Sequence, residues 1–311
     1  MNEKHPLSNP VLSRLSLRVP AGFNFWRTVL SHGWCSLPPF AYNADARQLD
    51  RVLRLSDESV VHCRLRGNGQ TVAVVVASKT PLAKHHRKDI AQQLAICLRL
   101  DEDFSPFHAE ARRRPKHRWI STSCSGRLLR SPSVFEDAVK MICTTNCTWS
   151  LTTLMVSNLV QNYGQRFDDT LCAFPTPQAI AATTEKHLRT VCKTGYRAPY
   201  ILELGKRVAA VRLDIESWRD STLATDELFK QLREVKGIGP YAAGNILKLL
   251  GRYDYLGLDS WVRAKYYELH RRGRKVKDAA IEKHYAPYGK WRGLFFWLEM
   301  TKYWHDEKFE L

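Results

Sequence analysis

The chain has 311 residues, of which 44% are hydrophobic and 25% are charged, proportions that are ordinary for a globular protein. Lysine and arginine number 48 against 31 acids, and the net charge of +17 favours a polyanionic partner, nucleic acid before an anionic membrane. No stretch approaches the length of a transmembrane helix, and the polar N-terminus MNEKHPLSNP lacks the apolar core of a signal peptide. We therefore expect an intracellular protein with no membrane partner, although charge alone also fits a merely basic protein.

Residues 13 to 78 contain short β-rich stretches separated by turn signals such as Gly67-Asn68-Gly69. The expected strands are 13–20, 34–43, 48–56, 59–67 and 71–78. Residues 81–100 follow as one amphipathic helix that opens at a proline. This pattern predicts an α+β fold whose first domain, residues 1–122, is an antiparallel sheet with a helix.

From about residue 126 the apolar pattern becomes helical, which predicts a second, all-α domain over residues 123–311. Ser133 and Glu136 have the spacing of a capping box at the start of its first helix. Further helices are expected at 150–164, from 177, at 184–191 and 197–211, and over the C-terminal stretch WRGLFFWLEMTKYW. Two basic runs, 111–118 and 270–277, are interpreted as solvated loops, with phosphate contact as the alternative.

The eight cysteines are scattered and form no CxxC pattern. Cys143 and Cys147 are the closest pair, but no matching pair of histidines or cysteines completes a metal site. We therefore expect reduced structural thiols and no bound metal.

The stretch KGIGPYAAG contains a tight turn, Gly237-Ile238-Gly239, between two helical patterns. Thr225 is predicted to cap the first helix, and Pro240 takes the favoured first position of the second. Such a turn leaves backbone N–H groups and a helix N-terminus free for a phosphate, and glycine permits close approach. A plain corner between two helices explains the local pattern equally well.

Asp259 follows about twenty residues later and precedes another helical pattern, so it is a good helix N-cap. A capping aspartate can also be functional if its carboxylate faces a cleft.

Residues 225–266 resemble the helix-hairpin-helix, Gly/Pro-rich loop and aspartate motif of the HhH-GPD DNA glycosylase superfamily. The segment GRLLRSPSVFEDAVKMICTTNCTW (126–149) and residues 195–198 are similar to 8-oxoguanine DNA glycosylases. The segments FPTPQAIAA and YAPYGKWRGLFFW resemble the bacterial alkylpurine glycosylases (3-methyladenine type II) equally well. The resemblance covers residues 125–300 and places the chain between these two branches.

The resemblance implies that the protein binds double-stranded DNA and flips a damaged nucleotide out of the stack. Residues 237–239 would grip the phosphate backbone, assisted by a monovalent cation on the hairpin carbonyls. Tyr196 would wedge into the gap, and Arg197 would donate hydrogen bonds to the orphaned opposite base. Asn146 occupies the family's asparagine position in the preceding loop.

Asp259 matches the catalytic aspartate of the superfamily. Its carboxylate would stabilise the positive charge that develops on the sugar, and would orient or deprotonate water. Tyr241 stands where bifunctional members have a lysine, and tyrosine forms no Schiff base, so the resemblance implies a monofunctional enzyme. No cysteine follows Cys192, so the four-cysteine iron–sulfur loop of related branches is absent, and no cofactor is expected.

Alkylpurine glycosylases hold electron-poor, cationic bases between aromatic walls. We expect the base pocket to be lined by Tyr241, Trp297, Phe296 and Trp149. Gly293 falls where the 8-oxoguanine branch has a glutamine that reads the base edge, and Leu151 replaces a second arginine that reads the opposite base. These departures favour alkylpurine chemistry on a scaffold of the 8-oxoguanine type.

We therefore predict a monofunctional, monomeric, DNA-associated DNA glycosylase of base excision repair. The first candidate for its substrate is an alkylated purine, 3-methyladenine or 7-methylguanine. The alternative substrate is 8-oxoguanine or a deaminated base, and the alternative of another class is a catalytically silent protein that binds DNA lesions.

Overall fold

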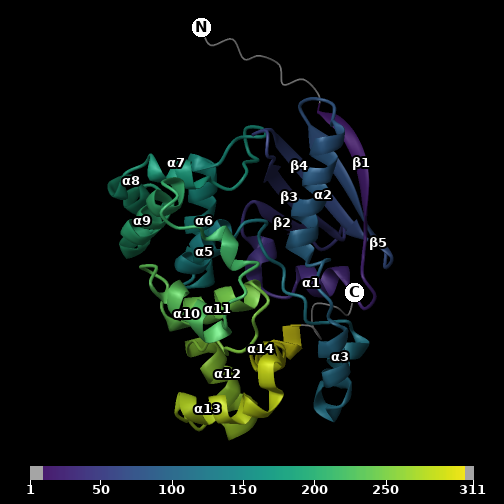
Figure 1. Ribbon diagram of the computed structural model, residues 1–311, viewed down its shortest axis with the longest axis vertical. Helices are drawn as coiled ribbons and strands as arrows, with labels where there is room; N and C mark the ends of the chain where they lie inside the picture. The colour runs from purple at the N-terminus through teal and green to yellow at the C-terminus, as the bar shows by residue number, and fades with distance from the viewer. Residues whose placement is uncertain (1–9, 305–311) are drawn as a thin grey trace.

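The computed structural model describes residues 10–304, and its N-terminal part is a five-stranded antiparallel sheet (Figure 1). The strand order is β1-β5-β4-β3-β2, and the strands are β1 (Val11–Arg18), β2 (Phe40–Asn43), β3 (Gln48–Arg54), β4 (Val60–Gly67) and β5 (Thr71–Ser78). Helix α2 (Lys84–Leu98) lies across one face of the sheet, where its Ile90 and Leu94 join the buried valines of β5. The predicted sheet with its helix is therefore confirmed.

The stretch 34–43 is strand only over β2, so the longer predicted strand is wrong at its N-terminal end. Residues Gly33–Ser36 form a 3₁₀ turn, η1, after the short helix α1 (Phe25–Val29). Pro38 and Pro39 separate η1 from β2, and because proline has no N–H, neither residue can donate to a sheet ladder.

The basic run 111–118 is not a solvated loop. It ends α3 (Ser105–Arg112), continues through the 3₁₀ turn η2 (Pro115–His117) and begins α4 (Arg118–Thr122). His117 is buried against the rings of Tyr288 and Phe295 near the other end of the chain. The second basic run, 270–277, is the end of a helix and the loop after it.

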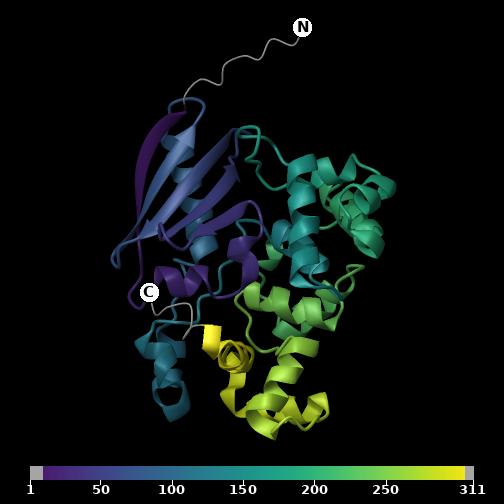
Figure 2. The same cartoon turned by 180° about the vertical axis from the view of Figure 1, so that it is seen from behind.

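Most of the remaining described chain is helical, as predicted, and lies beside the sheet (Figure 2). The helices are α5 (Val134–Cys143), α6 (Trp149–Tyr163), α7 (Pro177–Ala181), α8 (Glu185–Thr190), α9 (Ala198–Ala209), α10 (Thr225–Arg233), α11 (Pro240–Leu249), α12 (Ser260–Arg271), α13 (Asp278–Tyr285) and α14 (Arg292–Met300). Short 3₁₀ turns precede α9, α10 and α14: η3 (Gly195–Arg197), η4 (Glu216–Trp218) and η5 (Ala286–Trp291). Within residues 10–304, no helix has both the length and the apolar character needed to cross a membrane.

One cluster of buried side chains runs from the sheet and α2 into α5, α11 and α14. A smaller cluster joins α12, α13 and α14. Because the large core is shared by residues on both sides of position 122, the division into two domains at that position stays a prediction.

Two helix starts differ from their predicted form. Ser133 accepts a hydrogen bond from the Glu136 backbone, 3.2 Å, but the Glu136 carboxylate binds Arg51 of β3 instead of returning to the helix start. The first two N–H groups of α5 are capped by Glu216 instead. Thr225 is the first residue of α10 and not its cap, and its hydroxyl donates to Asp254.

Candidate active site

A cavity of about 920 Å³ lies where four segments of the helical part meet. The walls are the loop after α5, the η3 turn with the start of α9, the hairpin between α10 and α11, and the first turn of α12. The predicted site residues among its lining are Asn146, Tyr196, Gly237, Ile238, Gly239, Tyr241 and Asp259. The hairpin and the acid therefore face one shared space.

The hairpin is a tight turn that only glycine suits at its first position. Gly237 has φ of +89°, and a Cβ atom there would lie 2.8 Å from the Cβ of Tyr200. Ile238 is buried and anchors the turn in the core. Gly239 has φ of −79°, and a Cβ atom there would meet nothing within 4 Å. The backbone at Gly239 is therefore open to an approaching ligand.

Asp259 is the N-cap of α12, and its Oδ1 accepts a hydrogen bond of 2.8 Å from the Val262 backbone. This bond fixes the carboxylate at the cavity wall. In the described chain its Oδ2 has no hydrogen-bond partner, so that oxygen is open to a ligand. Arg263, one turn along α12, is paired with Asp278 at 2.8 Å.

Tyr241 lies in the first turn of α11, and its half-buried side chain faces Asp259 and Thr144. Burial and, to a smaller extent, the nearby Asp259 carboxylate together raise the pKa of its hydroxyl to about 12, and a hydrogen bond with Thr144 acts in the opposite direction. The phenol therefore stays protonated at neutral pH. It offers the cavity an aromatic face and a neutral hydroxyl, and no amine.

Tyr196, Arg197 and Asn146 connect the η3 turn to the loop after α5. The Tyr196 hydroxyl donates to the Thr145 carbonyl at 3.3 Å, and the Asn146 amide donates to that hydroxyl at 3.4 Å. Asn146 has φ of +47°, a conformation that asparagine tolerates better than most residues. Arg197 is only 3% exposed, and its guanidinium donates to Thr145 and lies 4.4 Å from the Tyr196 ring centroid. Contact between Arg197 and an opposite base stays a prediction, and it requires these bonds to open.

Three of the expected base-pocket residues lie outside this cavity. Phe296 is fully buried with its ring 5.1 Å from that of Tyr285, so it is a core residue and not a wall. The Trp297 indole N–H donates to the Ser31 carbonyl at 3.1 Å. Trp149 is packed over Gly33, where a Cβ atom would lie 2.3 Å from the indole.

Two aromatic walls were not predicted from the sequence. Trp261 is 37% exposed and lines the cavity two residues after Asp259, with its ring stacked on Trp304. Tyr200 lines it beneath the hairpin. The position of Trp261 could have been predicted from the sequence, because a residue in the first turn of a helix lies close to the N-cap residue, here Asp259.

The cavity rim is mainly basic. Arg233, Lys236 and Arg263 line it, against Asp259 as its one acidic lining residue in the described chain. Lys236 pairs with Glu203 at 2.9 Å. A rim of this charge fits a polyanionic ligand.

One group of potential metal ligands occurs in the part of the chain that the structure describes. Ligand atoms of Asp57, His85 and His86 lie within 4.8 Å of one another, outside the cavity lining. Both ring nitrogens of His86 are engaged, because Nδ1 accepts from the Ala83 backbone and Nε2 binds Asp57. A metal at Nε2 would have to break this arrangement, so the residues do not fit a preformed metal site.

A family model matches the part of the chain that carries the site. Residues 139–286 match the model of the HhH-GPD superfamily base excision DNA repair protein. YfjP of Bacillus subtilis (strain 168), provisionally named a DNA-3-methyladenine glycosylase, is 24% identical over 171 residues. That alignment covers 53% of this chain and 58% of YfjP, so the chain spans little more than half of this relative.

Two solved structures share the fold. The 3-methyladenine DNA glycosylase from Archaeoglobus fulgidus superposes with a TM-score of 0.74 at 20% identity, covering 93% of this chain and 98% of that one. The Clostridium acetobutylicum 8-oxoguanine glycosylase/lyase, bound to dsDNA containing cytosine opposite to 8-oxoG, gives 0.70 at 19% identity, with 96% and 98% covered. These likenesses confirm the α+β fold. The residues that match this family model, 139–286, carry both the hairpin and Asp259.

Proposed function

We propose that this protein is a monofunctional DNA glycosylase that hydrolyses the N-glycosidic bond of a damaged base in duplex DNA. The observation that carries the proposal is the Asp259 carboxylate, which is fixed by one oxygen at the wall of the hairpin cavity and open at the other. A pure DNA-binding protein has no need of an acid beside an anionic ligand.

The reaction breaks the bond between the sugar C1′ and the base, and the base leaves with the bonding electrons. Positive charge develops on the sugar, and the fixed Asp259 carboxylate stabilises that charge. Water then adds to C1′ and loses a proton to Asp259 or to solvent. The products are the free base and an abasic site.

The side chains of the cavity support hydrolysis by water over attack by an amine. Tyr241 supplies a phenol where a lysine would form a Schiff base. Lys236 lines the cavity but its amine pairs with Glu203, and the Lys248 amine is buried and bonded to the Leu256 carbonyl. The proposed enzyme therefore leaves the DNA strand intact.

The composition of the walls favours an alkylated purine as the substrate. Tyr241, Trp261 and Tyr200 offer electron-rich faces, and Asp259 adds a negative charge, a combination that suits a cationic base. At Gly293 a Cβ atom would lie 2.1 Å from the Tyr255 carbonyl, so no base-reading side chain fits there. The alternative substrates, 8-oxoguanine and deaminated bases, are neutral and would gain less from this cavity.

The proposed partner is duplex DNA, bound by a monomer in the compartment that holds the DNA. The basic rim and the open backbone at Gly239 support phosphate contact at the hairpin. The family resemblance also implies a monovalent cation bound by the hairpin carbonyls. In the described chain the carbonyls of residues 236–238 accept no hydrogen bond, so they are free to hold such an ion.

The two hairpin glycines provide a test of phosphate contact. Gly237→Ala should lower the free energy of unfolding by about 1–2 kcal/mol, because alanine is strained at positive φ. Gly239→Ala should leave stability within about 0.5 kcal/mol. It should weaken duplex binding by about tenfold or more, since a methyl group would block a hydrogen bond to phosphate. Urea unfolding and fluorescence anisotropy measure the two effects, and wild-type affinity in Gly239→Ala would remove the hairpin from the DNA interface.

The proposed activity is tested with duplexes that carry 3- or 7-methylpurine, 8-oxoguanine, hypoxanthine or uracil. We expect strand breaks at the methylated base only after alkali treatment, because the enzyme itself leaves an intact abasic strand. Borohydride should trap no covalent adduct, since Tyr241 forms no Schiff base. Nicking without alkali, or a trapped adduct, would contradict the monofunctional assignment. Preferred release of 8-oxoguanine would contradict the alkylpurine assignment.

A further inference from the structure

Lys248 is a buried amine that the proposed chemistry does not use. It lies on α11 two turns after Tyr241, on the same face of the helix, and is 2% exposed. Its Nζ donates to the Leu256 carbonyl and to the side-chain oxygen of Asn245, the latter at 3.1 Å. Leu256 is three residues before Asp259, so this amine contacts the segment that delivers the acid to the cavity.

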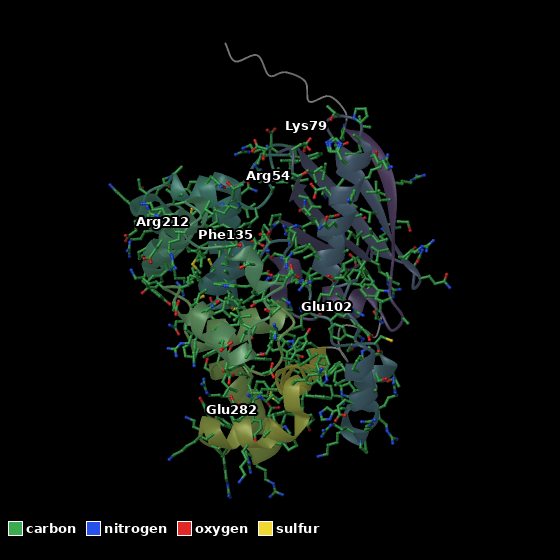
Figure 3. The ribbon with its side chains drawn as sticks, in the orientation of Figure 1. Arg54, Lys79, Glu102, Phe135, Arg212 and Glu282 are labelled. Atoms are coloured by element: carbon green, nitrogen blue, oxygen red, sulfur yellow. The ribbon has the colours of Figure 1, made fainter. Side chains whose placement is uncertain are left out.

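A lysine at this position is unfavourable for stability alone. Burial lowers the pKa of the amine to about 7, although the carboxylates of Asp259 and Glu282 act in the opposite direction. Glu282, on α13, is labelled in Figure 3. The amine also lies 5.9 Å from the centroid of the Trp297 ring. Methionine would fill a similar space without desolvating an amine, so what the lysine adds here is its hydrogen bonds to Leu256 and Asn245.

The segment between α11 and α12 is held to the rest of the molecule at successive residues. The Tyr253 and Asp254 carbonyls accept hydrogen bonds from the Gly293 backbone and Arg292, at the start of α14. Among the described residues, the last carbonyl before Asp259 that accepts a hydrogen bond is that of Leu256, and its donor is Lys248. The part of the segment nearest the acid therefore depends on α11.

Close packing accompanies this hydrogen bond. A Cβ atom on Gly257 would lie 2.8 Å from the Asn245 amide nitrogen, and one on Gly244 would lie 3.1 Å from the Gly257 Cα. The Asn245 amide also donates to the Tyr241 carbonyl at 2.9 Å. Lys248 and Asn245 thus connect the first turn of α11, which carries Tyr241, to the segment that carries Asp259.

We propose that Lys248 is a positioning residue that holds the segment before Asp259 against α11 and so sets the placement of Asp259 relative to Tyr241. The amine does not reach the cavity and takes no part in bond breaking. The expected effect of Lys248 on the rate of base release rests on the proposed glycosylase function. Its expected effect on the position of the segment before Asp259 does not. An acid displaced by about 1 Å from the sugar would cost about 10²-fold in rate.

The test is Lys248→Met in the full-length protein. Backbone amides of residues 250–260 should exchange with deuterium about tenfold faster, because local opening no longer breaks the Lys248 bond. The single-turnover rate of base release should fall about 10²-fold. Affinity for a duplex with a stable abasic analogue should stay within about threefold, since the hairpin is unchanged. Lys248→Gln, which keeps a shorter N–H donor, should restore part of both losses.

Lys140→Met is the matched control. Lys140 is the other lysine on α5 or α11 with a fully buried amine, but it pairs with Glu136 at 2.7 Å, away from the cavity. This variant should be less stable yet keep the wild-type exchange of residues 250–260 and the wild-type rate in its folded fraction.

Wild-type exchange of residues 250–260 in Lys248→Met would overturn the proposal, as would faster exchange spread evenly over the chain. If the wild-type protein released no base from any duplex, the proposed function would fail. The exchange comparison between Lys248→Met and Lys140→Met would still decide the role of Lys248.

Discussion

Replacing Asp259 with asparagine is expected to lower the single-turnover rate of base release by about 10²–10³-fold. Asparagine is as good an N-cap as aspartate, so the bond from the Val262 backbone and the start of α12 should persist. What disappears is the negative charge that faces the developing sugar cation. Quenched-flow or manual sampling with excess enzyme measures the rate, and circular dichroism checks that the helices are intact.

Asp168→Asn is the matched control for this charge removal. Asp168 also accepts backbone N–H bonds, from Thr170 and Leu171 at 2.8 and 2.7 Å, but it lies in a loop outside the cavity. Its rate should stay within about twofold of wild type, as for most surface changes. A wild-type rate in Asp259→Asn would rule out catalysis by this carboxylate. Lesion binding with no base release in either protein would favour the catalytically silent alternative.

The local signals in the sequence predicted the parts of the fold that local interactions decide. Pro240 at the start of α11, Asp259 at the cap of α12 and Gly164 at the end of α6 are each where the structure has them. Caps and prolines act within one helical turn, so the sequence around them carries the necessary information.

Non-local contacts account for what the sequence did not predict. The run ARRRPKHR looked solvated because of its charges, yet His117 is buried by residues more than 170 positions later in the chain. Glu136 fitted a capping box, but its carboxylate is drawn to Arg51 on a distant strand. Partners so remote in sequence are brought together only by the packing of the sheet against the helices.

The candidate site likewise contains residues that the sequence predicted and residues that it did not. The turn at 237–239, Tyr241 and Asp259 lie in one cavity because the motif fixes their relative positions along two helices. Whether Phe296 and Trp297 face the cavity depends on how α14 is rotated against its neighbours, and no local sequence pattern determines that rotation. Phe296 consequently lies in the core, whereas Trp261, which follows the acid directly, is a wall.

Replacing Glu136 with glutamine is expected to lower the free energy of unfolding by about 3–5 kcal/mol. The Glu136 carboxylate lies 2.8 and 2.6 Å from two nitrogens of Arg51 and 2.7 Å from the Lys140 amine, and all three side chains are buried. The substitution leaves two buried cations without an anion. Urea unfolding at pH 7 measures the loss. Glu58→Gln, which removes an exposed partner of Arg54, should cost less than about 1 kcal/mol.

The same carboxylate should make stability fall in acid. Burial alone would raise the pKa of Glu136, but Arg51 and Lys140 outweigh it and hold the pKa at about 2, below its ordinary value of 4.5. A depressed folded-state pKa stabilises the protein fully above 4.5, and this contribution is lost as the pH falls toward 2. The difference in unfolding free energy between wild type and Glu136→Gln should therefore shrink over that range, because protonated Glu136 resembles glutamine.

This acid sensitivity bears on the site because Glu136 joins the sheet to α5. The C-terminal end of α5 leads directly into residues 144–147, which form one wall of the cavity. Loss of the ion pair between Glu136 and Arg51 of β3 should therefore loosen that wall relative to the sheet. A constant difference in stability between the two proteins from pH 5 down to about pH 2 would show that Glu136 is not the group that titrates.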